Sequence, residues 1–371
     1  MIGSPMKLLI KAAVMGLCLT SCLAASASYP VVCSAFDGRG DSATVTLAEQ
    51  KLVFQVSRAS GGPLSLSKSV SDVGLLGCKV FFDNDSHYMA VGLAHLGLVA
   101  GPLRIVVTDL TTGKFASDFT VPNAGLGASL KLAGFLQDKS ALVVLGSGAP
   151  DRPTTAFSTA LFRVTGEQEN PPETRNLPAD AESVGNVSFA DAAHNRLWFK
   201  SRPQFCPLRS VPLVGDGADG ARVDEANAQA ACDVVSAIAY PDGNSLITAT
   251  AREPDDLITS VDFTAHSAQQ LALPATGGHG SYTSVGTGAL SPDGQVFAVS
   301  RNLLSNSLSG DAHSRGTEVD IVQVSPLKII GKVRLKPDAD PASLSIDHRN
   351  GTVTVLSFQA GRWDSKPLKV Q

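Results

Sequence analysis

The chain has 371 residues, of which 43% are hydrophobic and 17% are charged, and its formal net charge is −4. So few charged residues exclude a coiled coil and a charge-rich disordered chain. The net negative charge also argues against a protein that coats nucleic acid, so no nucleic-acid partner is predicted.

Residues 1–27 are predicted to be a signal peptide. Lys7 and Lys11 give the segment a positive start, a short apolar stretch follows, and small residues lead to a cleavage site after Ala27. Cleavage there leaves residues 28–371 as a single exported domain, periplasmic or extracellular. The apolar stretch is too short to span a bilayer, so we expect no transmembrane segment.

A second processing route stays open at the same end of the chain. Residues 19–22 read Leu-Thr-Ser-Cys, which resembles a bacterial lipobox, where the cysteine thiol receives a diacylglycerol and becomes the mature N-terminus. Lipidation of Cys22 would make the protein a membrane-anchored lipoprotein. Both routes predict export.

Four cysteines follow the leader: Cys33, Cys78, Cys206 and Cys232. An even number in an oxidising compartment favours disulfides, and four cysteines allow three pairings. We predict Cys33–Cys78 and Cys206–Cys232, because each of these pairs closes the shorter loop; free buried thiols are the alternative. The chain has no C-x-x-C motif from which to build a zinc or thioredoxin-type site.

Short apolar runs rich in Val, Leu, Ile, Phe and Thr alternate with clusters of Gly, Pro, Asp, Asn and Ser over the rest of the chain. This is the pattern of strands and turns, and it predicts an all-β fold. The predicted strands include, in chain order, residues 43–47, 52–56, 104–109, 141–145, 197–200, 245–250, 296–300, 319–324 and 352–357. The one helix-like segment, residues 223–231, is short and rich in Ala.

A longer period is superimposed on these strands. In six places an apolar strand is followed by a turn that contains Asp and then by a second apolar strand. The marker residues are Asp83, Asp138, Asp191, Asp242, Asp293 and Asp347, spaced by 55, 53, 51, 51 and 54 residues. A regular period near 50 with several strands in each unit is typical of arrays of small sheets arranged radially.

Two motifs carry a resemblance to a known family. Residues 291–294 read Ser-Pro-Asp-Gly before an apolar strand, and residues 107–114 read Val-Thr-Asp-Leu-Thr-Thr-Gly-Lys. This pattern resembles bacterial WD40-like and YVTN-like β-propellers over residues 40–371. The Gly-His and Trp-Asp dipeptides of WD40 repeats do not recur, and two tryptophans cannot form the ladder of quinoprotein dehydrogenases, so no cofactor is predicted.

The six marked units, together with residues 28–70, predict seven blades of four antiparallel strands, with six blades as the alternative. Closure removes exposed sheet edges, so we expect the N- and C-terminal strands to complete the ring together.

A search for chemical motifs finds none with its required context. Residues 215–220 match G-x-G-x-x-G but lack the parallel βαβ units of a dinucleotide site. Ser65 and Lys68 match S-x-x-K without the accompanying motifs of serine enzymes. Among the histidines, His279 and His313 are the candidates to face a ligand. No catalytic, cofactor-binding or metal-binding residue is therefore predicted, and nothing in the sequence establishes an enzyme.

Three long connections, residues 146–155, 202–222 and 302–316, interrupt otherwise short turns. Extended loops on one rim of a rigid scaffold are common binding sites. The leading hypothesis is an exported, non-catalytic binding or scaffold propeller whose rim loops bind a protein, a glycan or a small ligand. The alternative is a propeller hydrolase or lactonase with a metal or acid site at the channel mouth, assembled from several blades.

Overall fold

The computed structural model describes most of the chain after residue 30. The described residues are 31–37, 41–48, 51–58, 62–69, 76–95, 101–137, 141–148, 155–178, 181, 189–200, 208–215, 234–251, 255–274, 281–291, 293–306, 312–335, 340–347, 352–359 and 362–369. Every regular element within these ranges is a strand, so the all-β prediction is confirmed for them. They contain no helix long and apolar enough to cross a membrane. The helix-like segment at 223–231 lies outside them.

Seven antiparallel sheets contain these strands. The first sheet is β1 (Val31–Phe36), β2 (Ser42–Ala48), β3 (Lys51–Ser57) and β4 (Leu64–Ser69). The second is β5 (Leu76–Phe82), β6 (Tyr88–His95), β7 (Leu103–Asp109) and β8 (Lys114–Val121). The third is β9 (Ser129–Leu136), β10 (Ala141–Ser147), β11 (Ala156–Phe162) and β12 (Glu173–Asn176).

The remaining four sheets follow the same order along the chain. The fourth is β13 (Phe189–Asp191), β14 (Arg196–Lys200) and β15 (Leu208–Pro212). The fifth is β16 (Val234–Ala239), β17 (Ser245–Thr250), β18 (Asp256–Asp262) and β19 (Ser267–Leu273). The sixth is β20 (Ser281–Leu290), β21 (Val296–Asn306), β22 (Ala312–Gln323) and β23 (Lys328–Arg334). The seventh is β24 (Asp340–Asp347), β25 (Thr352–Gln359) and β26 (Arg362–Lys369).

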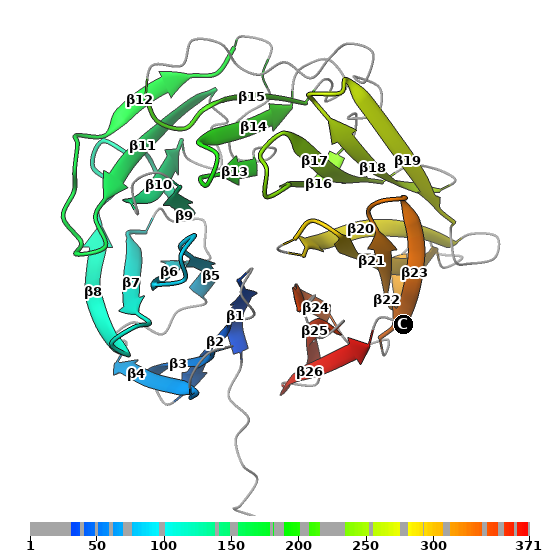
Figure 1. Cartoon of the computed structure of the whole chain (residues 1–371), viewed down its shortest axis with the longest axis horizontal. Helices are drawn as coiled ribbons and strands as arrows, with labels where there is room; N and C mark the ends of the chain where they lie inside the picture. Colours follow the sequence, from blue (N-terminus) through cyan, green and yellow to red (C-terminus); the bar gives the residue numbers. More distant parts are fainter. Residues whose placement is uncertain are drawn as a thin grey trace, which may run out of the picture.

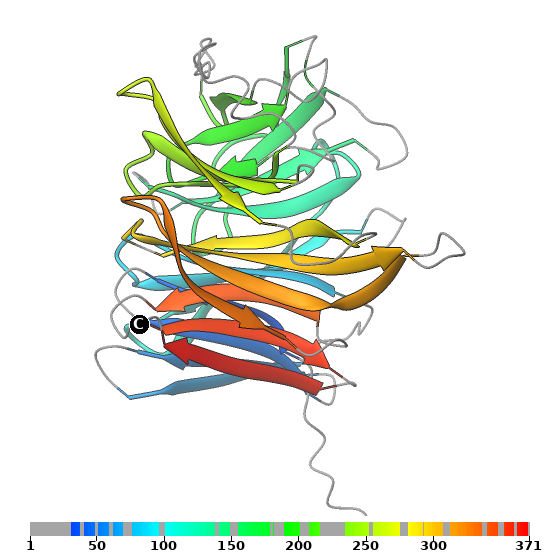
Figure 2. The ribbon, with the colours of Figure 1, turned by 90° about the vertical axis from the view of Figure 1, so that its right-hand side faces the viewer.

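The sheets surround a common centre (Figure 1), and they stack in layers when the molecule is seen from the side (Figure 2). The first strand of each sheet lies nearest the centre and the last strand lies at the periphery. Each innermost strand contacts the innermost strand of the next sheet, and β1 of the first sheet also contacts β24 of the seventh. The innermost strands therefore surround the axis of the ring.

The first and last sheets do not share a strand within the described residues. β24, β25 and β26 form a three-stranded sheet of their own, and β1 pairs with β2 instead. The chain reverses directly after β1, where the Asp37 backbone N–H donates to the Asp41 carbonyl at 2.9 Å. The joint terminal sheet expected from the sequence is thus not seen; β1 and β24 meet through packing.

The hydrophobic core lies between neighbouring sheets. Phe54 of the first sheet and Met89 of the second belong to one buried cluster, and Leu145 of the third and Phe199 of the fourth belong to another. Burying one such side chain is worth about 1.5–3 kcal/mol. Because middle strands are covered on both faces, β10 is apolar and buried almost throughout, whereas the outer strand β4 alternates between half-buried and exposed positions.

The marker aspartates form the turns that the sequence predicts. A carboxylate oxygen of Asp83 accepts a hydrogen bond from the Tyr88 backbone N–H at 3.0 Å, and Asp293 accepts one from the Ser291 hydroxyl at 2.6 Å. Asp37 caps the corresponding turn of the first sheet, where its Oδ1 accepts from the Asp41 N–H at 2.6 Å. Asp37 is therefore a seventh marker. Asp138 lies outside the described residues.

Equivalent turns of neighbouring sheets contact one another around the ring. The Ser86 hydroxyl in the second sheet donates to the Asp37 carboxylate in the first. The turn of the fifth sheet packs against His194 of the fourth, and a Cβ atom at residue 243 would lie 2.4 Å from the His194 ring. The φ of this residue is +68°. The close approach of the His194 ring and the positive φ both require glycine at position 243. The turn chemistry thus serves packing between sheets.

Candidate functional site

Two lysines occupy equivalent positions on neighbouring innermost strands. In the second sheet Lys79 of β5 is paired with Gly92. Gly92 is four residues beyond Tyr88, the first residue of β6, whose carbonyl accepts the hydrogen bond that closes the turn. In the third sheet Lys131 of β9 is paired with Leu145, again four residues beyond the first residue of β10. Each lysine is thus paired with the residue four positions beyond the first residue of the second strand of its sheet, and this register places the two lysines, here called the axial lysines, at the same level along the axis.

Because of the strand pleat, each axial lysine points from its own sheet toward the next sheet along the chain. Cys78 of β5 packs toward the first sheet and Phe81 toward the third, so Lys79, which alternates with Cys78, is directed toward the third sheet. On β9, Leu130 packs toward the second sheet, so Lys131 is directed toward the fourth. The two cations therefore follow one another around the axis.

Both axial lysines have side chains that reach solvent. The Lys79 side chain is exposed, and that of Lys131 is half-buried. Burial nevertheless lowers the pKa of Lys79, and burial together with the Lys79 charge lowers the pKa of Lys131 to about 8. In the described part of the chain, neither ammonium group has a hydrogen bond or ion pair.

An apolar side chain is also exposed on an innermost strand. Val235 of β16 is 45% exposed, the one large hydrophobic residue so exposed among the described side chains. The next residue, Ser236, pairs with Ala249, which is four residues beyond Ser245. Ser236 is thus the counterpart of the axial lysines in the fifth sheet. Unpaired charge and exposed apolar surface both occur on the strands around the axis.

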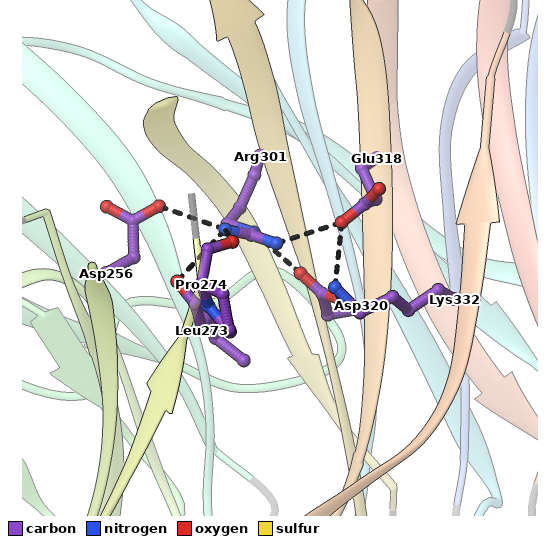
Figure 3. A network of polar contacts seen from close by, with 7 residues as sticks. All are labelled: Asp256, Leu273, Pro274, Arg301, Glu318, Asp320 and Lys332. Carbon is purple, nitrogen blue, oxygen red and sulfur yellow. Dashed lines mark hydrogen bonds and ion pairs between the residues drawn. The ribbon is translucent and has the colours of Figure 1, made fainter. Parts of the chain in front are cut away.

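Other polar clusters hold sheets together. The largest, the Arg301 network, joins the fifth and sixth sheets (Figure 3) and contains Asp256, Leu273, Pro274, Arg301, Glu318, Asp320 and Lys332. Arg301 is fully buried; its Nε donates to Asp320 at 2.6 Å and its Nη2 to Glu318 at 2.9 Å. Its Nη1 donates to the carbonyl of Pro274 across the interface at 3.1 Å.

Lys332 completes the network from β23. Its Nζ lies 3.0 Å from Asp320 Oδ1 and 3.1 Å from Glu318 Oε1. Although burial lowers the pKa of Lys332, the hydrogen bonds to Asp320 and Glu318 raise it on balance. With every charge engaged, the network has no group left for a ligand, and we assign it to the joining of sheets.

A smaller cluster joins the fourth and fifth sheets. His194 Nδ1 lies 2.8 Å from a carboxylate oxygen of Asp191, and His194 Nε2 lies 3.0 Å from the Pro241 carbonyl oxygen. The hydrogen bond to Asp191 raises the pKa of His194, against a smaller lowering by burial. Because both ring nitrogens face acceptors, the doubly protonated imidazolium fits this position best.

The predicted cysteine pair Cys33–Cys78 is present as a disulfide. It joins β1 to β5, the innermost strands of the first two sheets, with Cα atoms 5.5 Å apart. Cys206 and Cys232, the lipidation candidate Cys22 and the cleavage site at Ala27 lie outside the described residues. The described residues contain no group of three or more His, Cys, Asp or Glu side chains that could hold a metal ion.

The prediction of loops at residues 202–222 and 302–316 is wrong in part. The 302–316 connection continues as strand on both sides, and the pairing of β21 with β22 extends to Asn306 and Ala312. β20 pairs alongside, as in Tyr282 with Leu304, so three strands support one another and project beyond their neighbours (Figure 2). His313 is therefore in β22 and not in a loop, and the 202–222 connection contains β15.

The other motifs gain no partners for catalysis. Lys68 of the S-x-x-K match lies on β4 and pairs with Asp118 of the second sheet at 2.8 Å, while Ser65 is exposed on the same strand. Gly215 ends the described part of the G-x-G-x-x-G match, and His279 lies outside the described residues.

No protein-family model and no curated protein matches the sequence. Several solved structures resemble the fold. A prolyl endopeptidase has a TM-score of 0.54 at 10% identity, over 92% of this chain and 50% of that chain. The β-propeller domain of the Trilobed protease from Pyrococcus furiosus, described as having an open velcro topology, has a TM-score of 0.51 at 12% identity, over 93% and 98%. Hsv2 from Kluyveromyces lactis has a TM-score of 0.49 at 12% identity, over 93% and 100%.

These likenesses show the fold. The chain is a β-propeller, built of several four-stranded antiparallel sheets around an axis. At 10–12% identity they carry no information about activity.

Proposed function

We propose that the protein is an exported, non-catalytic binding propeller whose ligand contacts the innermost strands at the ring axis. Residues 28–371 form one domain of seven blades, similar to WD40-like and YVTN-like propellers, and the ring is closed by contact between β1 and β24. The leader is removed at Ala27 or, by the second route, at Cys22.

One observation carries the binding assignment. A desolvated charge without a partner is costly in a folded protein, and a ligand that pairs with it repays that cost. Within the described part of the chain Lys79 and Lys131 have no such partner, and both lie on innermost strands, as does the exposed Val235. Inter-sheet contacts such as the Arg301 network support the rigidity that a preformed site needs.

The projecting part of the sixth sheet supports a second contact surface on the same molecule. β20, β21 and β22 have 10, 11 and 12 residues, longer than any other described strand. Their shared extension places a stiff structure where the sequence predicts a loop, and it offers a surface for a protein or glycan.

A steric block at the axis tests the proposal. Val235→Trp places a bulky ring at an exposed position of β16, and Ala272→Trp, at an exposed position of the outer strand β19, is the matched control. The purified protein is screened by thermal shift against neutral oligosaccharides, peptides and small organic acids. At least one probe is expected to raise the melting temperature of the unmodified protein and of Ala272→Trp, but not of Val235→Trp.

Two results would contradict the proposal. Equal shifts in Val235→Trp and in the control would place the ligand away from the axis. Turnover of an ester or lactone that Val235→Trp abolishes would replace the binding assignment with the hydrolase alternative.

A further inference from the structure

The axial lysines are two positive charges with no partner among the described residues. Their described neighbours do not supply a negative charge. On β7, Asp109 caps its own turn through Thr111 at 2.8 Å, and Arg104 is paired with Asp118 of β8 at 2.8 Å. These acids are therefore engaged elsewhere.

β13 of the fourth sheet also packs against β9, and it offers no free acid either. Its Asp191 is bonded to His194 at 2.8 Å. β10 carries no charged residue, and the one charged group of β5 is Lys79 itself. Of the groups facing Lys131, Lys79 is the one that alters its titration, and it does so as a like charge.

Two like charges at one level of neighbouring innermost strands indicate what would bind there. Neighbouring packed sheets lie about 10 Å apart, and lysine side chains at the same level extend from two such sheets. A lysine ammonium is a compact charge with three donors, and it binds carboxylates and phosphates as a point charge. A neutral ligand would leave both charges uncompensated, and a cation would add to the repulsion.

We propose that the axial lysines form an oxyanion subsite, so that the ligand of this propeller carries a carboxylate or phosphate group bound between Lys79 and Lys131. The subsite lies on the strands assigned to binding above and rests on that proposed function.

Calorimetric titration with three probes tests this subsite. Inorganic phosphate, citrate and a neutral trisaccharide are titrated into the purified protein at pH 7 in a buffer free of other oxyanions. Lys79→Met and Lys131→Met keep the length of the side chain and remove its charge. Lys51→Met, at an exposed position of β3, is the matched control.

Oxyanion binding is expected to weaken at least tenfold in each axial variant, to vanish in the double variant and to be unchanged in Lys51→Met. Whichever of phosphate and citrate binds more tightly identifies the oxyanion. Raising the pH from 7 to 9.5 is expected to weaken binding by at least fivefold, because Lys131 loses its proton. Amine labelling followed by peptide mapping should show Lys131 protected by the bound oxyanion.

Failure of this inference and failure of the proposed function give different results. Oxyanion binding that survives in the double variant, or no binding of either oxyanion at millimolar concentration, overturns the subsite. If a neutral probe still binds and Val235→Trp abolishes its binding, the axial binding function stands and the oxyanion assignment alone is wrong.

Discussion

At the scale of single residues, ionisable side chains in this protein take two opposite roles. His194 has an acceptor at each ring nitrogen, so its environment favours the charged form. Lys131 is desolvated by burial and has a like charge nearby, and it has no acceptor among the described residues, so its environment disfavours the charged form and lowers its pKa. The first residue stabilises an interface between sheets, while the second weakens the free protein and is available to a ligand.

His194→Gln is expected to destabilise the protein in a pH-dependent way. The pKa of His194 is raised on folding, so its charged interaction with Asp191 contributes fully below about pH 6.5 and is lost as the pH rises through the raised value. We expect a loss of about 1 kcal/mol at pH 5.5 and less at pH 8.5. Urea unfolding at both pH values measures it; an equal loss at the two would contradict the charged interaction.

Lys131→Met is expected to stabilise the free protein. The pKa of Lys131 is lowered to about 8 on folding, so the unfolded chain holds the proton more tightly and the stability of the unmodified protein rises between about pH 8 and pH 10.5. With allowance for partial solvent access, the variant should gain about 1–2 kcal/mol at pH 7, and the gain should shrink toward pH 10.5. A variant less stable at pH 7 would show that the ammonium group has a partner.

At the scale of strands and sheets, stability comes from contacts that join one sheet to the next. A sheet of three or four strands cannot hide both of its faces alone, so each depends on its two neighbours. Side chains on one sheet donate to carbonyl oxygens of the next, as Arg58 does to Leu110 at 3.0 Å and Arg175 to Pro212 at 3.1 Å. Arg196 makes the same kind of contact with Gly243 at 2.9 Å.

Arg301→Met tests the most buried of these contacts. It leaves Glu318 and Asp320 without their guanidinium partner in a buried setting, and we expect a loss of about 3–5 kcal/mol. Arg196→Met, which removes one partly buried hydrogen bond, is the control and should cost about 1 kcal/mol. If guanidinium unfolding gave equal losses for the two variants, the Arg301 network would not stabilise the interface.

The Cys33–Cys78 disulfide makes a covalent link between the first two sheets. It closes a loop of 45 residues, so replacing both cysteines by serine should cost about 2–4 kcal/mol. Unfolding curves with and without reductant measure this cost. If the reductant changed the unfolding curve of neither the unmodified protein nor the double variant, the bridge would not form in solution.

At the scale of the whole molecule, much of the fold is predictable from the sequence because its signals are local. A turn such as residues 291–294 contains its own hydrogen-bonding groups, and their recurrence every 50 residues indicates the repeated sheet. The extension of β21 and β22 is different, since its Ser- and Asn-rich sequence becomes strand only because β20 supports it from the other side. That support is a tertiary contact with no local signal.

The axial site is less accessible to sequence reasoning. The sequence signal for this site is a charged residue inside an otherwise apolar first strand. Lys79 and Lys131 are both residues of this kind. Their alignment at one level, however, depends on counting pairs from each turn and on an irregularity in β9 near Gly134, where the pairing shifts against Val143 and Val144. A bulge of this kind cannot be read from strand periodicity. The Arg301 network is also only partly visible in the sequence. Its acidic partners Glu318 and Asp320 alternate on β22, but its backbone acceptors lie in another sheet.

The most direct test of the account is a crystal structure of the protein grown with citrate or phosphate. We predict seven sheets around one axis and an oxyanion in contact with the ammonium groups of both Lys79 and Lys131. An axis in which those ammonium groups are instead paired with carboxylates of the chain itself, with the oxyanion absent, would contradict the claim that this ring binds its ligand there.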